Sequence, residues 1–213
     1  VVNVNDKFTS MVLGEKEQVI YGKGYIEDEL CGMTFKISPK SFYQVNPAQA
    51  EILYKKAIEY AGLSGRETLL DAYCGTGTIG IIAAPGAEKV IGVEFSKDAV
   101  RDAIAGAKGN GISNIRFYQA DAGKFMEELV KENEKVDVVI MDPPRSGCSE
   151  SFLASLTRLK PEKIVYVSCN PETLARDLGY LCGKGYRMKR GMAVDMFPYT
   201  DHIETIVALS RIK

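Results

Sequence analysis

The amino-acid sequence predicts an α/β fold in which a doubly wound, mostly parallel sheet carries helices on both faces. Segments with apolar residues at helical spacing alternate with apolar runs of strand length. Such alternation produces βαβ units and therefore a parallel sheet. The length of 213 residues, 46% of them hydrophobic, allows one sizeable core. Five strands are expected, at residues 67–74, 89–95, 114–121, 136–142 and 163–169.

The first 38 residues differ from the rest of the chain. Their β-prone segments are short and are separated by glycines, which indicates a small antiparallel β unit. A unit of this size is too small to fold alone, so we expect it to be the remainder of a truncated domain. The expected strands lie at residues 11–14, 18–22, 24–30 and 33–38.

Helices and a final pair of strands complete the pattern. The first helix is expected over residues 47–63, with Pro47 at its start and Gly62 near its end. Two last strands, over 186–196 and 204–212, have no helix between them. A hairpin that closes a doubly wound, seven-stranded sheet is typical of the class I methyltransferase (Rossmann-like) fold. Further helices are expected at 97–109, 122–132, 149–160 and 171–185.

Composition excludes several classes of protein. With 27 Lys and Arg against 28 Asp and Glu, the net charge is −1, which argues against a strongly basic nucleic-acid binder. No apolar run approaches the roughly 20 residues that span a bilayer, and no signal segment opens the chain, so we expect no membrane partner. One histidine and no closely paired cysteines make a structural zinc site unexpected.

The cysteines indicate a cytoplasmic protein. They are odd in number and widely spaced, which favours reduced thiols in a reducing compartment over disulfides. One of them is therefore a candidate nucleophile. The five are Cys31, Cys74, Cys148, Cys169 and Cys182.

A glycine-rich loop at residues 71–80 predicts a cofactor site. It follows an apolar strand and leads into a helix, where glycines such as Gly75 let the backbone approach a ligand closely. The pattern G-x-G-x-x-G also fits a nicotinamide cofactor. Two carboxylates at strand ends favour S-adenosylmethionine instead: Asp71 for an ammonium group and Asp121 for an adenine amino group. Glu94 ends the strand between them and suits the ribose hydroxyls of either cofactor. A plain glycine turn with helix-capping carboxylates is the remaining alternative.

Two motifs follow the fourth and fifth strands. Asp142 begins the run D-P-P-R, whose prolines form a rigid turn. An aromatic residue commonly follows such prolines in enzymes that methylate the amino groups of bases, and Arg145 at this position weakens that interpretation. Cys169 lies between a strand and a helix start, where backbone amides and the helix dipole stabilise a thiolate. A packed core cysteine is the alternative, but the position opposite the D-P-P turn favours a nucleophile.

The last strand begins with a carboxylate. Glu204 precedes an apolar run, so partial burial with a raised pKa would suit it to act as a general base. An ordinary solvated carboxylate at a strand end is the simpler interpretation from the residues alone. We expect His202, two residues earlier, to be structural rather than catalytic.

Five sequence blocks, in this order, closely resemble the RNA 5-methyluridine methyltransferases. They are SFYQVNPAQAE, LLDAYCGTGTIG, VIMDPPRSG, YVSCNPETLARDL and DMFPYTDHIETIVAL. The resemblance implies that Cys169 is the nucleophile and that Glu204 is the proton acceptor. It also implies that S-adenosylmethionine is held by Gln44, Tyr73, Glu94, Asp121 and Asp142.

The resemblance also carries expectations about domains and partners. Members of that family have an RNA-binding β-barrel and part of a central β domain ahead of this region. We therefore expect residues 1–38 to be a remnant of the central domain and residues 39–213 to be the methyltransferase domain. The expected partner is RNA, ribosomal rather than transfer RNA, and the expected state is a monomer. A basic segment at 184–190 suggests weak, salt-sensitive RNA binding.

Two other functions stay open from the sequence. An amino-methyltransferase acting on a base or on a protein side chain would not need a thiol. A catalytically silent, truncated core would bind the cofactor and transfer nothing.

Overall fold

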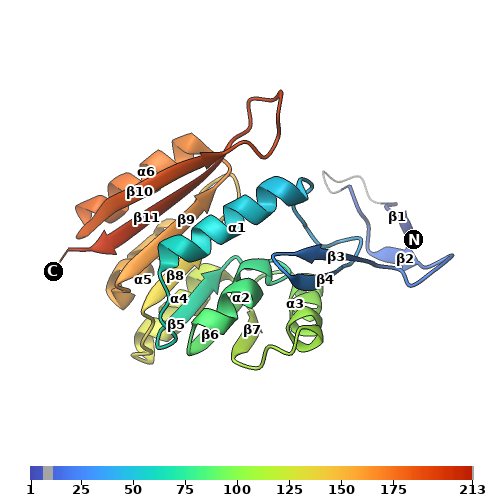
Figure 1. The fold of residues 1–213 in the computed structure, drawn as a ribbon, viewed down its shortest axis with the longest axis horizontal. Helices are drawn as coiled ribbons and strands as arrows, with labels where there is room; N and C mark the ends of the chain where they lie inside the picture. The colour runs from blue at the N-terminus through green and yellow to red at the C-terminus, as the bar shows by residue number, and fades with distance from the viewer. Residues whose placement is uncertain (7–11, 213) are drawn as a thin grey trace.

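The computed structural model describes residues 1–6 and 12–212 and contains a seven-stranded sheet (Figure 1). The strand order is β10-β11-β9-β8-β5-β6-β7, and β5 to β9 run parallel. Strand β11 runs antiparallel to both of its neighbours, which confirms the predicted closing hairpin. The strands are β5 (Thr68–Ala72), β6 (Lys89–Glu94), β7 (Ile115–Gln119), β8 (Val138–Met141), β9 (Lys163–Ser168), β10 (Tyr186–Val194) and β11 (Glu204–Arg211).

Helices cover both faces of this sheet (Figure 1). Neighbouring strand residues point to opposite sides, so each strand contributes to two apolar clusters. Leu69 and Val90 pack with the first three helices, whereas Leu70 and Ile91 pack with the last three. The predicted doubly wound architecture is therefore confirmed. The helices are α1 (Pro47–Ala61), α2 (Thr78–Ala83), α3 (Lys97–Gly109), α4 (Ala122–Lys131), α5 (Glu150–Leu159) and α6 (Pro171–Gly183).

Polar side chains start the helices at the carboxyl ends of the strands. Ser96, Asp121 and Ser149 each accept a hydrogen bond from a backbone N–H in the first turn of α3, α4 and α5. Asn170 does the same for α6, whose first residue is a proline. The end of each strand and the start of the next helix are thus fixed together at one edge of the sheet, where functional groups can converge.

The amino-terminal region forms two antiparallel pairs. Strand β3 (Ile26–Leu30) pairs with β4 (Met33–Ile37), which confirms the predicted hairpin. The other pair joins β1 (Val2–Val4) to β2 (Lys16–Gln18), so the strands predicted at 11–14 and 18–22 are wrong. Residue 11 lies outside the described residues, and 12–14 are not a strand.

The strands predicted at 11–14 and 18–22 fail because the apolar side chains that the structure describes there are not buried and because β1 pairs elsewhere. Val12, Val19 and Ile20 are exposed, so their β propensity has no apolar face to cover. Instead, Asn3 on β1 binds the segment that precedes β2. Its side chain accepts a hydrogen bond from the N–H of Gly14 and donates one to the Gly14 carbonyl. Such long-range pairing is not visible in a local pattern.

The β3–β4 hairpin packs on the main sheet unit. Phe35 is buried in the same cluster as α1 and α2, and Thr34 exchanges two hydrogen bonds with the Asn110 side chain at the end of α3. The domain boundary at residue 38 stays a prediction. Within the part of the chain that the structure describes, no helix is long and apolar enough to cross a membrane.

The packing of α1 on the sheet gives a test of this fold. Leu53 is fully buried on α1, whereas Ile52, its neighbour in the chain, is 43% exposed. We expect Leu53→Ala to lower the free energy of unfolding by about 3 kcal/mol, because it removes buried methyl groups and leaves a cavity. The matched control Ile52→Ala should change it by less than about 1 kcal/mol. Urea denaturation measures both, and equal losses would contradict the packing described.

Candidate functional site

A cavity of about 900 Å³ opens at the carboxyl ends of the parallel strands. This edge is where open α/β sheets bind their ligands. The cavity is bordered by the loops that follow β5, β6, β7, β8 and β9, by residues 40–44 and by the segment before β11. Eight of the nine site residues predicted from the sequence line it: Gln44, Tyr73, Gly75, Glu94, Asp121, Asp142, Cys169 and Glu204.

The glycine loop bends sharply at one side of the cavity. Tyr73, Gly75 and Gly77 all have positive φ angles, of 62°, 54° and 76°. A Cβ on Gly77 would lie 2.6 Å from the ring of Phe117, so this position requires glycine for close approach as well as for its backbone conformation. The loop therefore brings its backbone to the cavity wall, as predicted.

Asp71 is the one predicted residue that does not line the cavity. It is completely buried beneath the loop, and its Oδ2 accepts a 2.8 Å hydrogen bond from the Gly80 N–H. Burial is the main cause that raises the pKa of this carboxyl to about 7. The position favours support of the glycine loop over the direct ligand contact expected from the sequence.

Two carboxylates line the next part of the wall. Glu94 ends β6, and its two oxygens accept hydrogen bonds from the N–H groups of Gly75, at 3.1 Å, and Ser96, at 2.7 Å. Asp121 begins α4 rather than ending β7, and it accepts from the Lys124 N–H at 3.0 Å. Backbone donors thus hold both carboxylates in place, so a ligand meets them in a fixed orientation.

Gln44 has an unmet hydrogen-bonding capacity. Its side chain is 6% exposed, and its buried Oε1 has no hydrogen-bond partner among the described residues. A buried acceptor left unpaired costs about 1–3 kcal/mol. The loop that carries it is anchored to α3, because the Ser41 hydroxyl donates to buried Asp102 at 2.8 Å. A ligand that brings a donor to this wall would satisfy Gln44.

Cys169 and Glu204 line another part of the cavity. The antiparallel β9–β11 ladder ends at the pair of Ser168 with Thr205, and Cys169 and Glu204 are the residues that directly adjoin this last pair. Glu204 is only 4% exposed, and burial raises its pKa to about 7 while Arg145 acts in the opposite direction. The interpretation of Glu204 as an ordinary solvated carboxylate is therefore wrong.

The electrostatic environment of Cys169 differs from the one predicted. Burial, followed by the charges of Glu204 and Asp142, raises the pKa of the thiol. Arg145 lowers it, by a hydrogen bond and by its charge, but does not offset the other effects. The prediction of a thiolate stabilised at the helix start is wrong, because burial and then the carboxyls of Glu204 and Asp142 raise the pKa of the thiol.

Asp142 lines the cavity beside these groups. Burial, and then the charges of Glu204 and Asp71, raises its pKa to about 8. Asp142, Glu204 and Asp71 therefore lie close enough for their negative charges to repel one another. A cationic ligand would relieve that repulsion, because opposite charge stabilises ionised carboxylates.

Arg145 and His202 form a contact that the sequence did not indicate. Nη2 of Arg145 lies 2.7 Å from Nδ1 of His202, and both residues line the cavity. His202 also meets Phe197 edge to face, with ring centroids 6.2 Å apart. The basic residue within D-P-P-R was the available signal; its partner comes from 57 positions away in the chain.

Among the described residues, no group of three or more His, Cys, Asp and Glu is arranged to hold a metal ion. The walls of the cavity are apolar and aromatic with a few fixed polar groups, which is typical of sites for organic ligands. Its aromatic members include Phe42, Tyr73 and Phe95.

Comparison with known proteins identifies relatives of the whole chain. An RNA methyltransferase of Caldanaerobacter subterraneus, whose activity is uncharacterised, is 50% identical over 99% of this chain and 47% of its own length. An RNA methyltransferase of Bacillus cereus is 46% identical over the full chain and 46% of its own length. This chain thus spans about half the length of the curated relatives that it matches.

Solved structures of methyltransferases are also similar to this chain. The Pyrococcus abyssi tRNA (uracil-54, C5)-methyltransferase, crystallised with S-adenosyl-L-homocysteine, is 36% identical. It superposes with a TM-score of 0.84 over 97% of this chain and 49% of that one. A ribosomal protein L11 methylase of Lactobacillus delbrueckii, 19% identical with a TM-score of 0.60 over 83% of this chain and 84% of its own, shares the fold alone.

The sequence model of one family, tRNA (uracil-5-)-methyltransferase, matches residues 7–212, nearly the whole chain. This match and the close relatives agree with the resemblance noted in the sequence. The chain belongs to the tRNA (uracil-5-)-methyltransferase family.

Proposed function

We propose that this chain is the catalytic part of an enzyme that methylates carbon 5 of a uridine in RNA, with S-adenosylmethionine as the methyl donor. One observation carries the proposal: Cys169 and the buried carboxyl of Glu204 adjoin the last pair of the β9–β11 ladder and line the same cavity, whose other groups suit that donor. In this proposal residues 39–213 are the methyltransferase domain, and residues 1–38 belong to a preceding β domain.

The residues of the cavity fit S-adenosylmethionine. The unpaired Oε1 of Gln44 would accept from its ammonium group, and the carboxyls of Glu94 and Asp121 would accept from its ribose hydroxyls and adenine amino group. The positive charge of the donor suits the acidic surroundings of Asp142. When bound, S-adenosylmethionine supplies an electrophilic methyl group.

Cys169 and Glu204 would perform the chemistry on the uracil ring. Carbon 5 is too weakly nucleophilic to attack a methyl group unaided. The Cys169 thiolate adds to carbon 6 and shifts the ring electrons to an enolate, which makes carbon 5 nucleophilic. After carbon 5 has gained the methyl group, Glu204 removes the proton from carbon 5. The bond between Sγ and carbon 6 then breaks and regenerates the thiolate.

The target uridine has to leave its stacked position to reach Cys169. The cysteine is half-buried in the cavity, so a base within a helix could not contact it. Base flipping or a single-stranded target is therefore part of the proposal. All five cysteines are free, in keeping with a reducing cytoplasm.

The class of RNA is a separate question. The expectation of ribosomal RNA stays a prediction. Transfer RNA is a second candidate, favoured by the family's name and by the tRNA enzyme of Pyrococcus abyssi. The exposed basic side chains of Arg187 and Lys189 on β10 are candidates for phosphate contacts with either RNA.

Covalent trapping tests the proposed function. RNA with 5-fluorouridine at the target should form an adduct that survives denaturation, because fluorine cannot leave as a proton does. Cys169→Ala should abolish the adduct, and Cys182→Ala, at an exposed position on α6, should not. Gel mobility and peptide mass spectrometry measure both.

The alternatives give different results in this experiment. Methyl transfer that persists in Cys169→Ala would indicate an amino-methyltransferase. Saturable S-adenosylmethionine binding with no adduct and no transfer to ribosomal or transfer RNA would indicate a catalytically silent core.

The unpaired oxygen of Gln44 leads to a test of donor binding. We expect Gln44→Ala to weaken S-adenosylmethionine binding about 10-fold or more, because a hydrogen bond to a charged group contributes about 1.5–3 kcal/mol. Gln18→Ala, on exposed β2, should leave the dissociation constant unchanged. Calorimetry measures both variants, and equal affinities would remove Gln44 from the binding site.

The pKa of Glu204 predicts a pH dependence for the last step. Only ionised Glu204 can accept a proton, so the methylated adduct should resolve faster as pH rises through about 7, the pKa that burial gives this carboxyl. The thiol is covalently bound during this step and does not titrate. In Glu204→Gln the adduct should accumulate and resolve slowly at every pH. Quench-flow measurement of normal resolution in that variant would exclude Glu204 as the base.

A further inference from the structure

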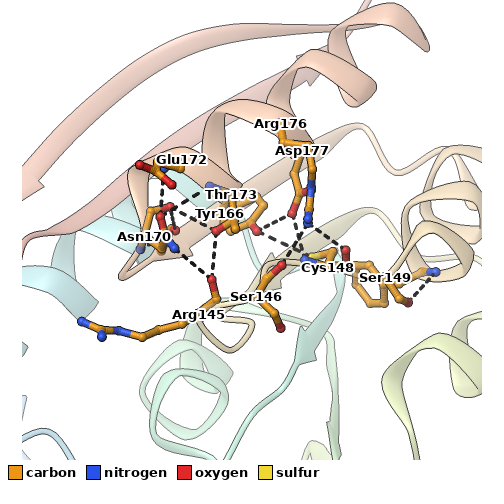
Figure 2. A network of polar contacts seen from close by, with 12 residues as sticks. Arg145, Ser146, Cys148, Ser149, Tyr166, Asn170, Glu172, Thr173, Arg176 and Asp177 are labelled. Carbon is orange, nitrogen blue, oxygen red and sulfur yellow. Dashed lines mark hydrogen bonds and ion pairs between the residues drawn. The ribbon is translucent and has the colours of Figure 1, made fainter.

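Asp177 is a buried carboxylate outside the cavity, and three separate segments supply its partners (Figure 2). It lies on α6 and is fully buried. Its Oδ2 accepts from the Tyr166 hydroxyl, at 2.7 Å, and from the Cys148 N–H, at 2.9 Å. Its Oδ1 forms an ion pair with Arg176, whose Nε lies 2.8 Å away. Asp177 therefore joins β9, α6 and the loop after β8.

The Arg176 side chain extends this network to the same loop. Its Nη2 donates to the carbonyls of Ser146 and Cys148, each at 3.1 Å. Gly147 between them has a φ angle of 75°, and a Cβ there would lie 2.5 Å from Nη2 of Arg176 and 2.8 Å from Oδ2 of Asp177. The loop backbone is thus packed directly against the Asp177–Arg176 pair.

Two side chains near the start of α6 hold the other end of the loop. The Arg145 carbonyl accepts from Nδ2 of Asn170, at 3.1 Å, and from the Thr173 hydroxyl, at 3.2 Å (Figure 2). Asn170 also accepts from the Glu172 N–H and so begins the helix. Residues 145–148 are therefore fixed to the first two turns of α6 at both ends.

The two segments joined in this way carry the proposed chemistry. Cys169 immediately precedes the helix start at Asn170, and the loop carries Asp142 and Arg145 into the cavity. Neither Asp177 nor Arg176 lines the cavity, so neither touches the substrate.

We propose that Asp177, acting through Arg176 and the Cys148 N–H, is a positioning residue that holds Arg145 beside Cys169 for attack on the uridine. This inference rests on the proposed function, in which Cys169 is the nucleophile. Arg145 is the cationic group that lowers the pKa of Cys169 and also that of Glu204. A shift of the loop would move this charge away from both groups.

The cost of burying a carboxylate supports a positioning role. Desolvation of an ion pair often offsets its Coulombic gain, so apolar residues could join a loop to a helix at less cost. An apolar contact, however, would not fix the direction of the backbone. The Cys148 N–H and two loop carbonyls are each held by a directional, charge-assisted hydrogen bond. The network therefore specifies one loop conformation.

The test compares Asp177→Asn with the parent chain, using as a matched control Asp98→Asn on α3, whose side chain is 40% exposed. Asp177→Asn should slow adduct formation with 5-fluorouridine RNA by about 10- to 100-fold, the loss expected when a reacting group is displaced by about 1 Å. Binding of S-adenosylmethionine should change less than about twofold, since Asp177 does not line the cavity. Asp98→Asn should match the parent in both.

The pH profile of Cys169 alkylation, followed by peptide mass spectrometry, separates positioning from stability. Arg145 lowers the pKa of the thiol, so displacing it should move the profile of Asp177→Asn toward higher pH. In an Arg145→Ala background, Asp177→Asn should add little further effect. A merely structural role would lower the free energy of unfolding and leave the profile in place.

A second variant, at Thr173, tests the positioning of Arg145 independently of Asp177. If Asp177→Asn does not fold, Thr173→Val, which removes the hydroxyl bonds to the Arg145 and Asn170 carbonyls, should shift the profile in the same direction. An unshifted profile in the folded variants, or full effects in the Arg145→Ala background, would overturn the inference. Absence of any adduct in the parent chain would instead contradict the proposed function, while the alkylation profile would still test the positioning of Arg145.

Discussion

The antiparallel pairing of β11 with β9 is the constraint on which the site depends. Because the ladder ends with the pair of Thr205 and Ser168, Glu204 and Cys169 both adjoin this pair, although 35 positions separate them in the chain. A shift of one residue would turn Glu204 to the other face of the sheet. The parallel strands determine where the cavity forms, but this one register brings a carboxyl to the thiol.

Burial determines the chemical state of the cavity. Asp142 and Glu204 both have raised pKa values, and their charges oppose ionisation of Cys169. Burial and these carboxyls raise the pKa of the thiol, and Arg145 is the opposing cation. In the proposed reaction a cationic donor would join Arg145 in balancing the charges of the carboxyls. The network around Asp177 keeps Arg145 available for that role.

Local patterns in the sequence predicted the five parallel strands, the closing hairpin and several cavity-lining residues, because strand ends in a doubly wound sheet converge at one edge. The family resemblance was needed for Gln44 and Tyr73. Local patterns did not predict properties that depend on long-range contacts. The hydrogen bond between Asn3 and Gly14 accompanies strands at other positions than those predicted. The hydrogen bond from the Gly80 N–H holds Asp71 beneath the glycine loop, away from the cavity. The raised pKa of Cys169 follows from its burial and from carboxyls that are distant in the chain. No spacing rule reveals such neighbours.

In the proposed reaction Cys169 and Glu204 act together at carbon 5 of uridine. Release of tritium to water from RNA that contains uridine tritiated at carbon 5, measured together with methyl transfer from S-adenosylmethionine, tests this joint role. One tritium should be released for each methyl group transferred, and both should be lost in Cys169→Ala. Methyl transfer without release of tritium would show that another atom is methylated and would contradict the proposed reaction.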